Sequence, residues 1–156
     1  MRFRHFARIA ALTTLPAAAL AQQPALPAPT TPPAAQAQGQ VVLELNAAAD
    51  TPTGACRLIV VTTNRLPQGL RRAAWQVAIF DRDGVVRSLP VLDFGPLIAG
   101  KTKVAQFEIP GLGCAQIGRI VVNDVAACEA GDGADLRDAC LSGLATQVRG
   151  DIDFGL

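Results

Sequence analysis

ACRLIVVTTN, residues 55–64, is a run of β-branched and apolar residues that opens with a small residue and a cysteine. Side chains alternate between the two faces of a β-strand, so Cys56, Leu58 and Val60 would share one face. Ile59 makes the opposite face apolar too. The stretch therefore predicts a strand, and it raises the question of whether Cys56 is a reactive thiol or one half of a disulfide.

Short segments of the same kind continue along the chain from Gln40 onward. Period-two runs separated by turn residues are typical of a β-sandwich or barrel. We therefore predict an all-β fold for residues 40–156, a single antiparallel, immunoglobulin-like β-sandwich of about seven strands. The expected strands lie within residues 41–45, 56–64, 75–79, 85–94, 104–109, 117–125 and 144–154.

Pro90 and a short polar segment interrupt this β pattern. Proline cannot donate to a strand ladder, so residues 85–94 should bend at Pro90 or stay at a sheet edge. Residues 135–141 are expected to form one turn of helix, with Asp135 as its cap.

The N-terminus reads as a secretory signal peptide in residues 1–21. Arg2, Arg4 and Arg8 precede an apolar run that is too short to span a membrane, and Ala19-Leu20-Ala21 forms an A-x-A cleavage site. We expect cleavage after Ala21 and a periplasmic or secreted product, without a membrane span in the mature chain.

Residues 22–39 contain prolines among Ala, Gln and Thr, and they carry no charge. Such a composition blocks helices and ladders and offers little to bury, so it predicts a disordered, extended linker. Its P-x-x-P spacings leave a polyproline ligand open as an alternative.

Charge excludes one class of partner. Loss of residues 1–21 removes three arginines and no acid, which leaves 11 of the 14 Lys and Arg residues against 13 Asp and Glu, a net charge of about −2. A chain so nearly neutral has no electrostatic footprint for nucleic acid.

The four cysteines allow three pairings. In an exported chain disulfides are the default, and strand order narrows the choice. The second and sixth expected strands run the same way, so Cys56 and Cys114 lie at one end of the domain. Cys128 and Cys140 bracket a connection at the other end. Because bridged Cα atoms lie within about 7 Å, we predict the disulfides Cys56–Cys114 and Cys128–Cys140.

The sequence has a cysteine before Trp75 and another cysteine after it, which is the order seen in immunoglobulin domains. The sequence has no tyrosine for a tyrosine corner. We therefore expect Trp75 to fill a general core position.

Residues for catalysis are missing from the expected mature chain. Its only histidine, His5, leaves with the signal peptide, so no imidazole remains to activate a serine. Ser88 and Ser142 have no nucleophile-elbow motif around them, and no glycine-rich loop leads into a helix. We expect no catalytic residue, no cofactor and no enzyme activity.

Asp81-Arg82-Asp83-Gly84 begins like a calcium-binding loop. The fifth, sixth and twelfth positions of such a loop would be Val85, Val86 and Leu92, which supply neither the ligands nor the glycine that an EF-hand needs. The motif predicts a hairpin turn.

The segment CEAGDGADLRDAC, residues 128–140, is rich in carboxylates. Asp132, Asp135 and Asp138 are the candidate ligands for calcium or another cation, because oxygen ligands suit hard cations. A solvated loop and a partner-binding loop on a rigid sandwich are the alternatives.

Several short motifs carry a resemblance to a known family. Asn64, then WQVAIFDRDGVV (75–86), LIAGKT (97–102) and QFEI (106–109) resemble the FxLYD-like domains of extracytoplasmic bacterial proteins. The whole chain is similar to small exported proteobacterial proteins known as "Tat pathway signal sequence domain" proteins. The resemblance implies a β-sandwich and an envelope location, and it transfers no catalytic residue.

These observations predict a non-catalytic binding or accessory module of the cell envelope, with an envelope protein as its partner. A cation-binding domain acting through residues 128–140 is the alternative. A binding module should present a contiguous apolar patch or an open sheet edge.

Overall fold

The computed structural model describes residues 40–156, which form nine strands, one short α-helix and one 3-10 helix. The signal peptide and the linker predicted for residues 1–39 lie outside the described residues. The strands are β1 (Val41–Asp50), β2 (Cys56–Asn64), β3 (Leu70–Asp81), β4 (Val86–Ser88), β5 (Val91–Leu97), β6 (Thr102–Ile109), β7 (Ile117–Ala130), β8 (Leu144–Val148) and β9 (Asp153–Gly155). The 3-10 helix η1 covers Cys114–Gln116, and α1 covers Arg137–Ser142.

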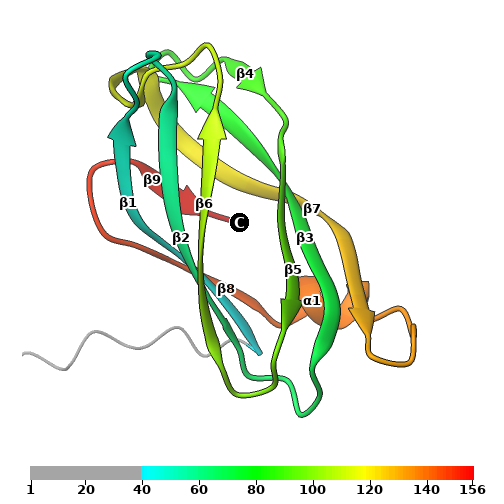
Figure 1. Cartoon of the computed structure of the whole chain (residues 1–156). Helices are drawn as coiled ribbons and strands as arrows, with labels where there is room; N and C mark the ends of the chain where they lie inside the picture. The colour runs from blue at the N-terminus through cyan, green and yellow to red at the C-terminus, as the bar shows by residue number, and fades with distance from the viewer. Residues whose placement is uncertain (1–39) are drawn as a thin grey trace, which may run out of the picture. The chain divides into compact units, whose positions relative to one another are not determined.

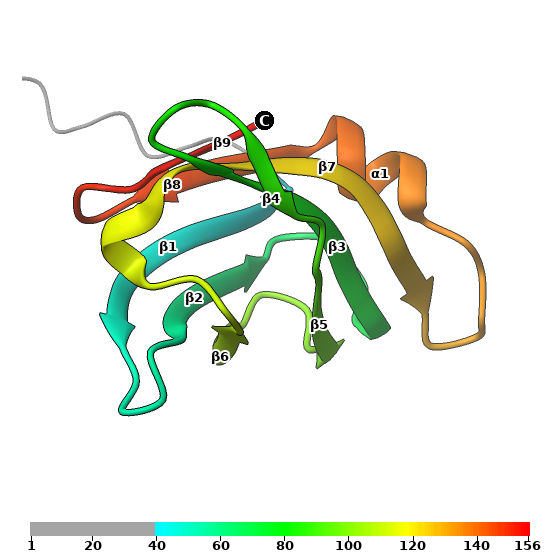
Figure 2. The ribbon, with the colours of Figure 1, turned by 90° about the horizontal axis from the view of Figure 1, so that it is seen from above.

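Two sheets pack against each other (Figures 1 and 2). Sheet A has the strand order β6-β2-β1-β8. Sheet B has the order β4-β3-β7-β9, and β5 also pairs with β3. The inward side chains of both sheets form one hydrophobic core. The predicted all-β sandwich is confirmed.

The pairing is mixed, which corrects the prediction of antiparallel strands throughout. β8 runs parallel to β1, from the pair Val41 and Leu144 to the pair Leu45 and Val148, and β9 runs parallel to β7. The last expected strand, residues 144–154, is therefore two strands in different sheets. The chain leaves sheet A after Val148 and turns at Gly150, whose φ of 125° suits glycine.

The expected strand over residues 85–94 is also divided. β4 and β5 both pair with β3, and Leu89 and Pro90 separate them. The Pro90 carbonyl accepts a hydrogen bond from the Val77 amide at 3.0 Å, so the proline sits at the sheet edge without breaking its contact to β3. In a constant-type immunoglobulin domain the fourth strand lies in the sheet of the first two, and here both pieces lie in the other sheet.

Trp75 connects the two sheets through an aromatic chain. Its side chain has no exposed surface, and its ring packs edge-on against Phe94 at a centroid distance of 5.6 Å. Phe94 in turn meets Phe107 of sheet A at 5.1 Å. The indole Nε1 donates to the Cys140 carbonyl at 3.4 Å. Trp75 thus occupies the core, as the sequence indicated.

Asn64 ends the stretch that opened the sequence analysis, and it is fully buried. Its Nδ2 donates to the carbonyls of Gln68 and Leu97, at 3.1 and 3.3 Å, and its Oδ1 accepts from the Leu66 amide at 3.0 Å. The side chain therefore satisfies backbone groups of the loop between β2 and β3 and of the end of β5, and its bonds to Leu66 and Leu97 are buried.

Replacing Asn64 by alanine is expected to lower the free energy of unfolding by about 2 kcal/mol, because buried backbone groups lose their partners. Urea unfolding followed by Trp75 fluorescence measures the change. Asn123→Ala is the matched control, since the Asn123 amide donates to Gln76 on an exposed surface and should cost less than about 0.5 kcal/mol. Equal losses in the two variants would show that burial of Asn64 is not the cause.

Candidate functional site

The four cysteines form the two disulfides that the strand order predicts. Cys56 is bonded to Cys114 and Cys128 to Cys140, with Cα separations of 4.7 and 6.3 Å. The first bridge ties β2 to η1, and the second ties β7 to α1. Disulfides indicate an oxidising compartment. All four cysteines are in structural disulfides, so none is a candidate reactive thiol.

The acidic loop is held together by its own hydrogen bonds. The Asp132 carboxylate accepts from the Ala134 amide at 3.0 Å. Arg137 donates from its Nε and its backbone amide to Asp135 Oδ1, and from Nε and Nη2 to Asp135 Oδ2. These contacts hold the pKa of the Asp135 carboxyl below its usual value. Asp135 lies before the N-cap of α1, which is Leu136, so it does not cap the helix as expected.

The three candidate cation ligands do not converge on one point. Asp135 and Asp138 line a hollow together with Asp124 and Arg137, whereas Asp132 is not part of its lining. Within residues 40–156, no group of three or more His, Cys, Asp or Glu side chains is placed to hold a metal ion. The arrangement does not support the cation-binding alternative.

The other charged motifs of the sequence form a turn and surface ion pairs. Residues 81–84 form the turn between β3 and β4, where the Asp81 carboxylate accepts from the amides of Asp83 and Val85. Arg71 and Arg72, at the start of β3, form ion pairs with Glu129 and Asp93.

An open sheet edge lies at the end of β1. β8 pairs with β1 only as far as Leu45, and the last hydrogen bond on that side runs from the Arg149 amide to the Leu45 carbonyl at 2.8 Å. β1 continues to Asp50 alongside β2, after an irregularity between Leu45 and Ala47. Among the described residues, no strand pairs with the β8 side of residues 46–50. We call residues 46–50 the open edge.

The backbone at the centre of the open edge faces away from β2. Cys56 N and Asn64 N, at the two ends of β2, donate to carbonyl groups on the β6 side. A strand turns alternate residues to opposite neighbours, so the odd-numbered residues of β2 face β1. Those residues pair with Ala47 and Ala49. The N–H and C=O of Ala48 therefore face the open edge.

A cleft of about 520 Å³ adjoins the open edge. Figures 1 and 2 show the crossover from β8 to β9 and the segment of η1 near the end of β1. Arg82, Arg149 and Asp151 are the charged residues of the lining. The other lining residues are Leu45, Asn46, Ala47, Ala48, Cys114, Ala115, Gly150 and Ile152.

Both arginines of the cleft are held in place through Nε. Arg82 Nε donates to the Ala115 carbonyl at 2.6 Å, and Arg149 Nε donates to Glu44 Oε1 at 2.8 Å. The bonds from Arg149 and Asn46 hold the pKa of the Glu44 carboxyl below its usual value. A guanidinium has five N–H donors, so the terminal nitrogens can also serve a ligand.

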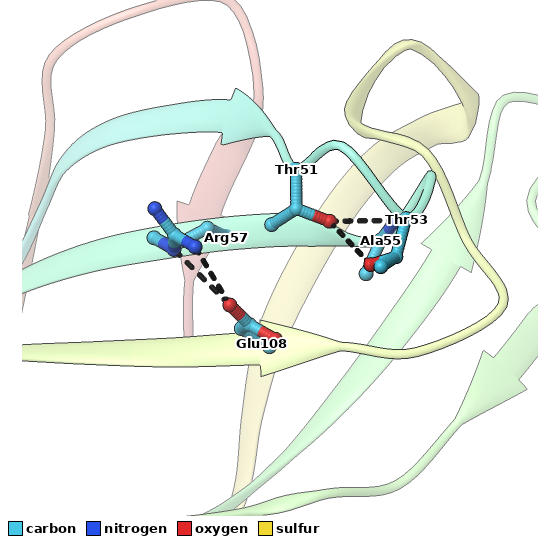
Figure 3. A network of polar contacts seen from close by, with 5 residues as sticks. All are labelled: Thr51, Thr53, Ala55, Arg57 and Glu108. Atoms are coloured by element: carbon cyan, nitrogen blue, oxygen red, sulfur yellow. Dashed lines mark hydrogen bonds and ion pairs between the residues drawn. The ribbon is translucent and has the colours of Figure 1, made fainter.

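The turn that follows the open edge is internally braced (Figure 3). Thr51 is buried, and its Oγ1 accepts from the Ala55 amide at 3.1 Å and lies 2.9 Å from the Thr53 hydroxyl. On the neighbouring strands, Arg57 of β2 forms an ion pair with Glu108 of β6 at 2.8 Å (Figure 3). The open edge is therefore anchored at its C-terminal end.

The other sheet edges are shielded or short. One side of the sandwich is formed by β5 and β6. There the Lys103 ammonium donates to the carbonyls of Phe94 and Pro96 in β5, so a charged side chain covers this edge. On the opposite side β8 and β9 contact each other. β4 spans only Val86–Ser88 and is followed by Pro90. The open edge of β1 is the best candidate binding site.

Sequence reasoning did not find this site. Ala47, Ala48 and Ala49 carry no chemical group that marks them, and the motif around Arg82 predicts only a turn. The weak signal is the run of small side chains that follows the expected strand of residues 41–45, since small residues allow another backbone to approach closely.

Comparisons with known proteins support the fold. No protein-family model matches the chain, and no curated protein matches it. Among solved structures the chain is similar to IrmA from Escherichia coli, with 13% sequence identity and a TM-score of 0.53. The similarity covers 70% of this chain and 92% of IrmA, and at this identity it shows the fold alone. Within residues 40–156, no helix has the length and hydropathy that crossing a membrane requires.

Proposed function

We propose that the protein is an exported, non-catalytic binding module of the cell envelope, cleaved after Ala21, and that it binds a partner protein at the cleft beside the open edge. The observation that carries the proposal is the cleft itself, where exposed backbone, small side chains and two guanidinium groups lie together. Binding domains present recognition groups on a rigid scaffold in this way. Two disulfides and a sandwich core supply such a scaffold.

The chemistry of the lining favours binding over catalysis. Its titratable side chains are Arg82, Arg149 and Asp151. A single carboxylate in the lining lacks the second acid or base that hydrolysis by paired carboxylates needs. Arginine remains charged and donates hydrogen bonds, so it recognises anionic or carbonyl groups without transferring a proton.

Capture of envelope proteins by the tagged chain, purified from the periplasmic fraction, tests this function. Intact mass should show a chain that begins at Gln22. The variant Arg82→Gln/Arg149→Gln should lose about tenfold or more of each specific partner. The matched control Arg71→Gln/Arg72→Gln removes the same charge from surface ion pairs at the start of β3, and it should retain the partners.

Two outcomes would contradict the proposal. One is an intact mass that includes residues 1–21. The other is a set of captured proteins that is the same for the wild type, the Arg82/Arg149 variant and the Arg71/Arg72 control, because such binding would not depend on the cleft.

A further inference from the structure

We infer that the cleft binds an extended, acidic peptide segment of the partner, which adds to sheet A as a strand alongside residues 46–50. This inference rests on the proposed function and specifies how the cleft recognises its partner. Strand addition uses main-chain hydrogen bonds for affinity and side-chain pockets for selectivity.

The direction of the free backbone groups supports a strand as the occupant. Ala48 turns its N–H and C=O away from β2, because Ala47 and Ala49 are the residues that pair with that strand. Ala48 pairs in register with Leu58, which is 1% exposed, yet Ala48 itself is exposed because the sheet ends beside it. An added strand would give the Ala48 amide and carbonyl the partners that β8 gives to Leu45.

The space beside the open edge fits an extended segment. Neighbouring strands lie about 4.8 Å apart, and a segment that matches residues 46–50 would extend about 16 Å. β8 occupies the same side of β1 up to Leu45, where the chain turns away toward β9. The added strand would therefore continue the line of β8. The methyl side chains of Ala47 and Ala48, which line the cleft, leave room for its side chains, and η1 approaches the far end of the edge, where the Cys114 amide donates to Asp50 Oδ1 at 2.6 Å.

The charge of the lining selects an acidic segment. Arg82, Arg149 and Asp151 line the cleft, and Glu44 pairs with Arg149 through Nε only, so the terminal guanidinium nitrogens of the two arginines are the cationic donors that a bound segment meets. Terminal guanidinium nitrogens form strong, paired hydrogen bonds with carboxylates. A peptide with Asp or Glu next to the strand-forming residues would meet both features of the cleft.

Selection from a phage-displayed library of random dodecapeptides, with the full mature chain as target, tests the inference. Selected peptides should be enriched in Asp or Glu within a β-branched segment. Their affinity, measured by calorimetry, should fall about tenfold for Ala48→Pro, which removes the N–H that faces the cleft. Ala48→Ser keeps this N–H and should bind within about twofold of the wild type.

N-methylation of the peptide gives a second measurement that leaves the protein unchanged. Methyl groups placed on successive peptide amides should weaken binding at every second position, since alternate amides of a strand face the same neighbour. A helical or polyproline ligand would not show period two. Urea unfolding checks that Ala48→Pro is folded, which is expected because proline is tolerated where an edge N–H faces solvent.

Three results would overturn the inference. They are selection of no peptide, equal affinity for Ala48→Pro and Ala48→Ser, and loss of binding at consecutive methylated positions. A dimer of the chain that Ala48→Pro abolishes, without any selected peptide, would assign the edge to a second copy instead. Partner capture that still depends on Arg82 and Arg149 would leave the proposed function standing in each of these cases.

Discussion

Replacing Cys56 and Cys114 together by alanine is expected to lower the free energy of unfolding by about 4 kcal/mol. The two cysteines are 58 residues apart, so their bond closes a long loop. Removing it gives the unfolded chain more conformational freedom, and this entropy grows with the length of the loop. The bond also ties β2 to η1, and η1 contributes Cys114 to the cleft. Loss of the bond should therefore weaken partner binding as well as stability.

Urea unfolding under non-reducing conditions, followed by Trp75 fluorescence, measures this loss. Cys128→Ala/Cys140→Ala is the comparison variant, because its bond joins residues only 12 apart and should cost about 3 kcal/mol. It also leaves the lining of the cleft intact, so partner capture should persist. A loss below about 1 kcal/mol for the Cys56/Cys114 variant would contradict the loop argument.

Trp75→Ala is expected to cost about 3 to 5 kcal/mol, the range for truncating a large buried aromatic side chain. Trp75 has no exposed surface and lies at the start of the aromatic chain that reaches Phe107 of sheet A through Phe94. The substitution leaves a cavity between the sheets. It also leaves the Cys140 carbonyl without the indole Nε1 donor. Cavity formation and the lost donor act in the same direction.

Circular dichroism must follow this unfolding, because Trp75 is the only tryptophan of the chain. Trp75→Phe is the matched control. It keeps an aromatic ring against Phe94 and loses the hydrogen bond and part of the volume, so it should cost about 1 to 2 kcal/mol. Similar costs for the two variants would mean that the hydrogen bond, and not the packing volume, dominates.

Local pattern was sufficient for several features of the fold. The alternation in ACRLIVVTTN places Cys56, Leu58 and Val60 on the core side of β2, and all three are buried. Cysteine positions relative to the expected strands were enough to choose one pairing among three, because strand direction decides which ends of a sandwich meet. Pro90 interrupts its strand for a local reason, the missing N–H.

The remaining features of the fold depend on contacts between segments that are far apart in the sequence. The alternating pattern of residues 144–154 predicts one strand, because a period of two specifies which face a side chain takes but not which strand lies alongside. The structure divides the segment between two sheets at Gly150. The acidic loop is a second feature that local pattern does not predict. Its composition suggests a cation site, but in the structure Arg137 lies beside Asp135 and satisfies the carboxylate.

The open edge depends on the local sequence and on the tertiary structure. The alternation in residues 41–45 predicts the first strand of a β-sandwich, and three alanines, residues 47–49, follow it in the sequence. The end of β8 beside Leu45 and the presence of Arg82 and Arg149 in the lining of one cleft follow from the tertiary fold. The physical reason is that an edge is defined by where a distant segment ends, and no residue of β1 carries that information.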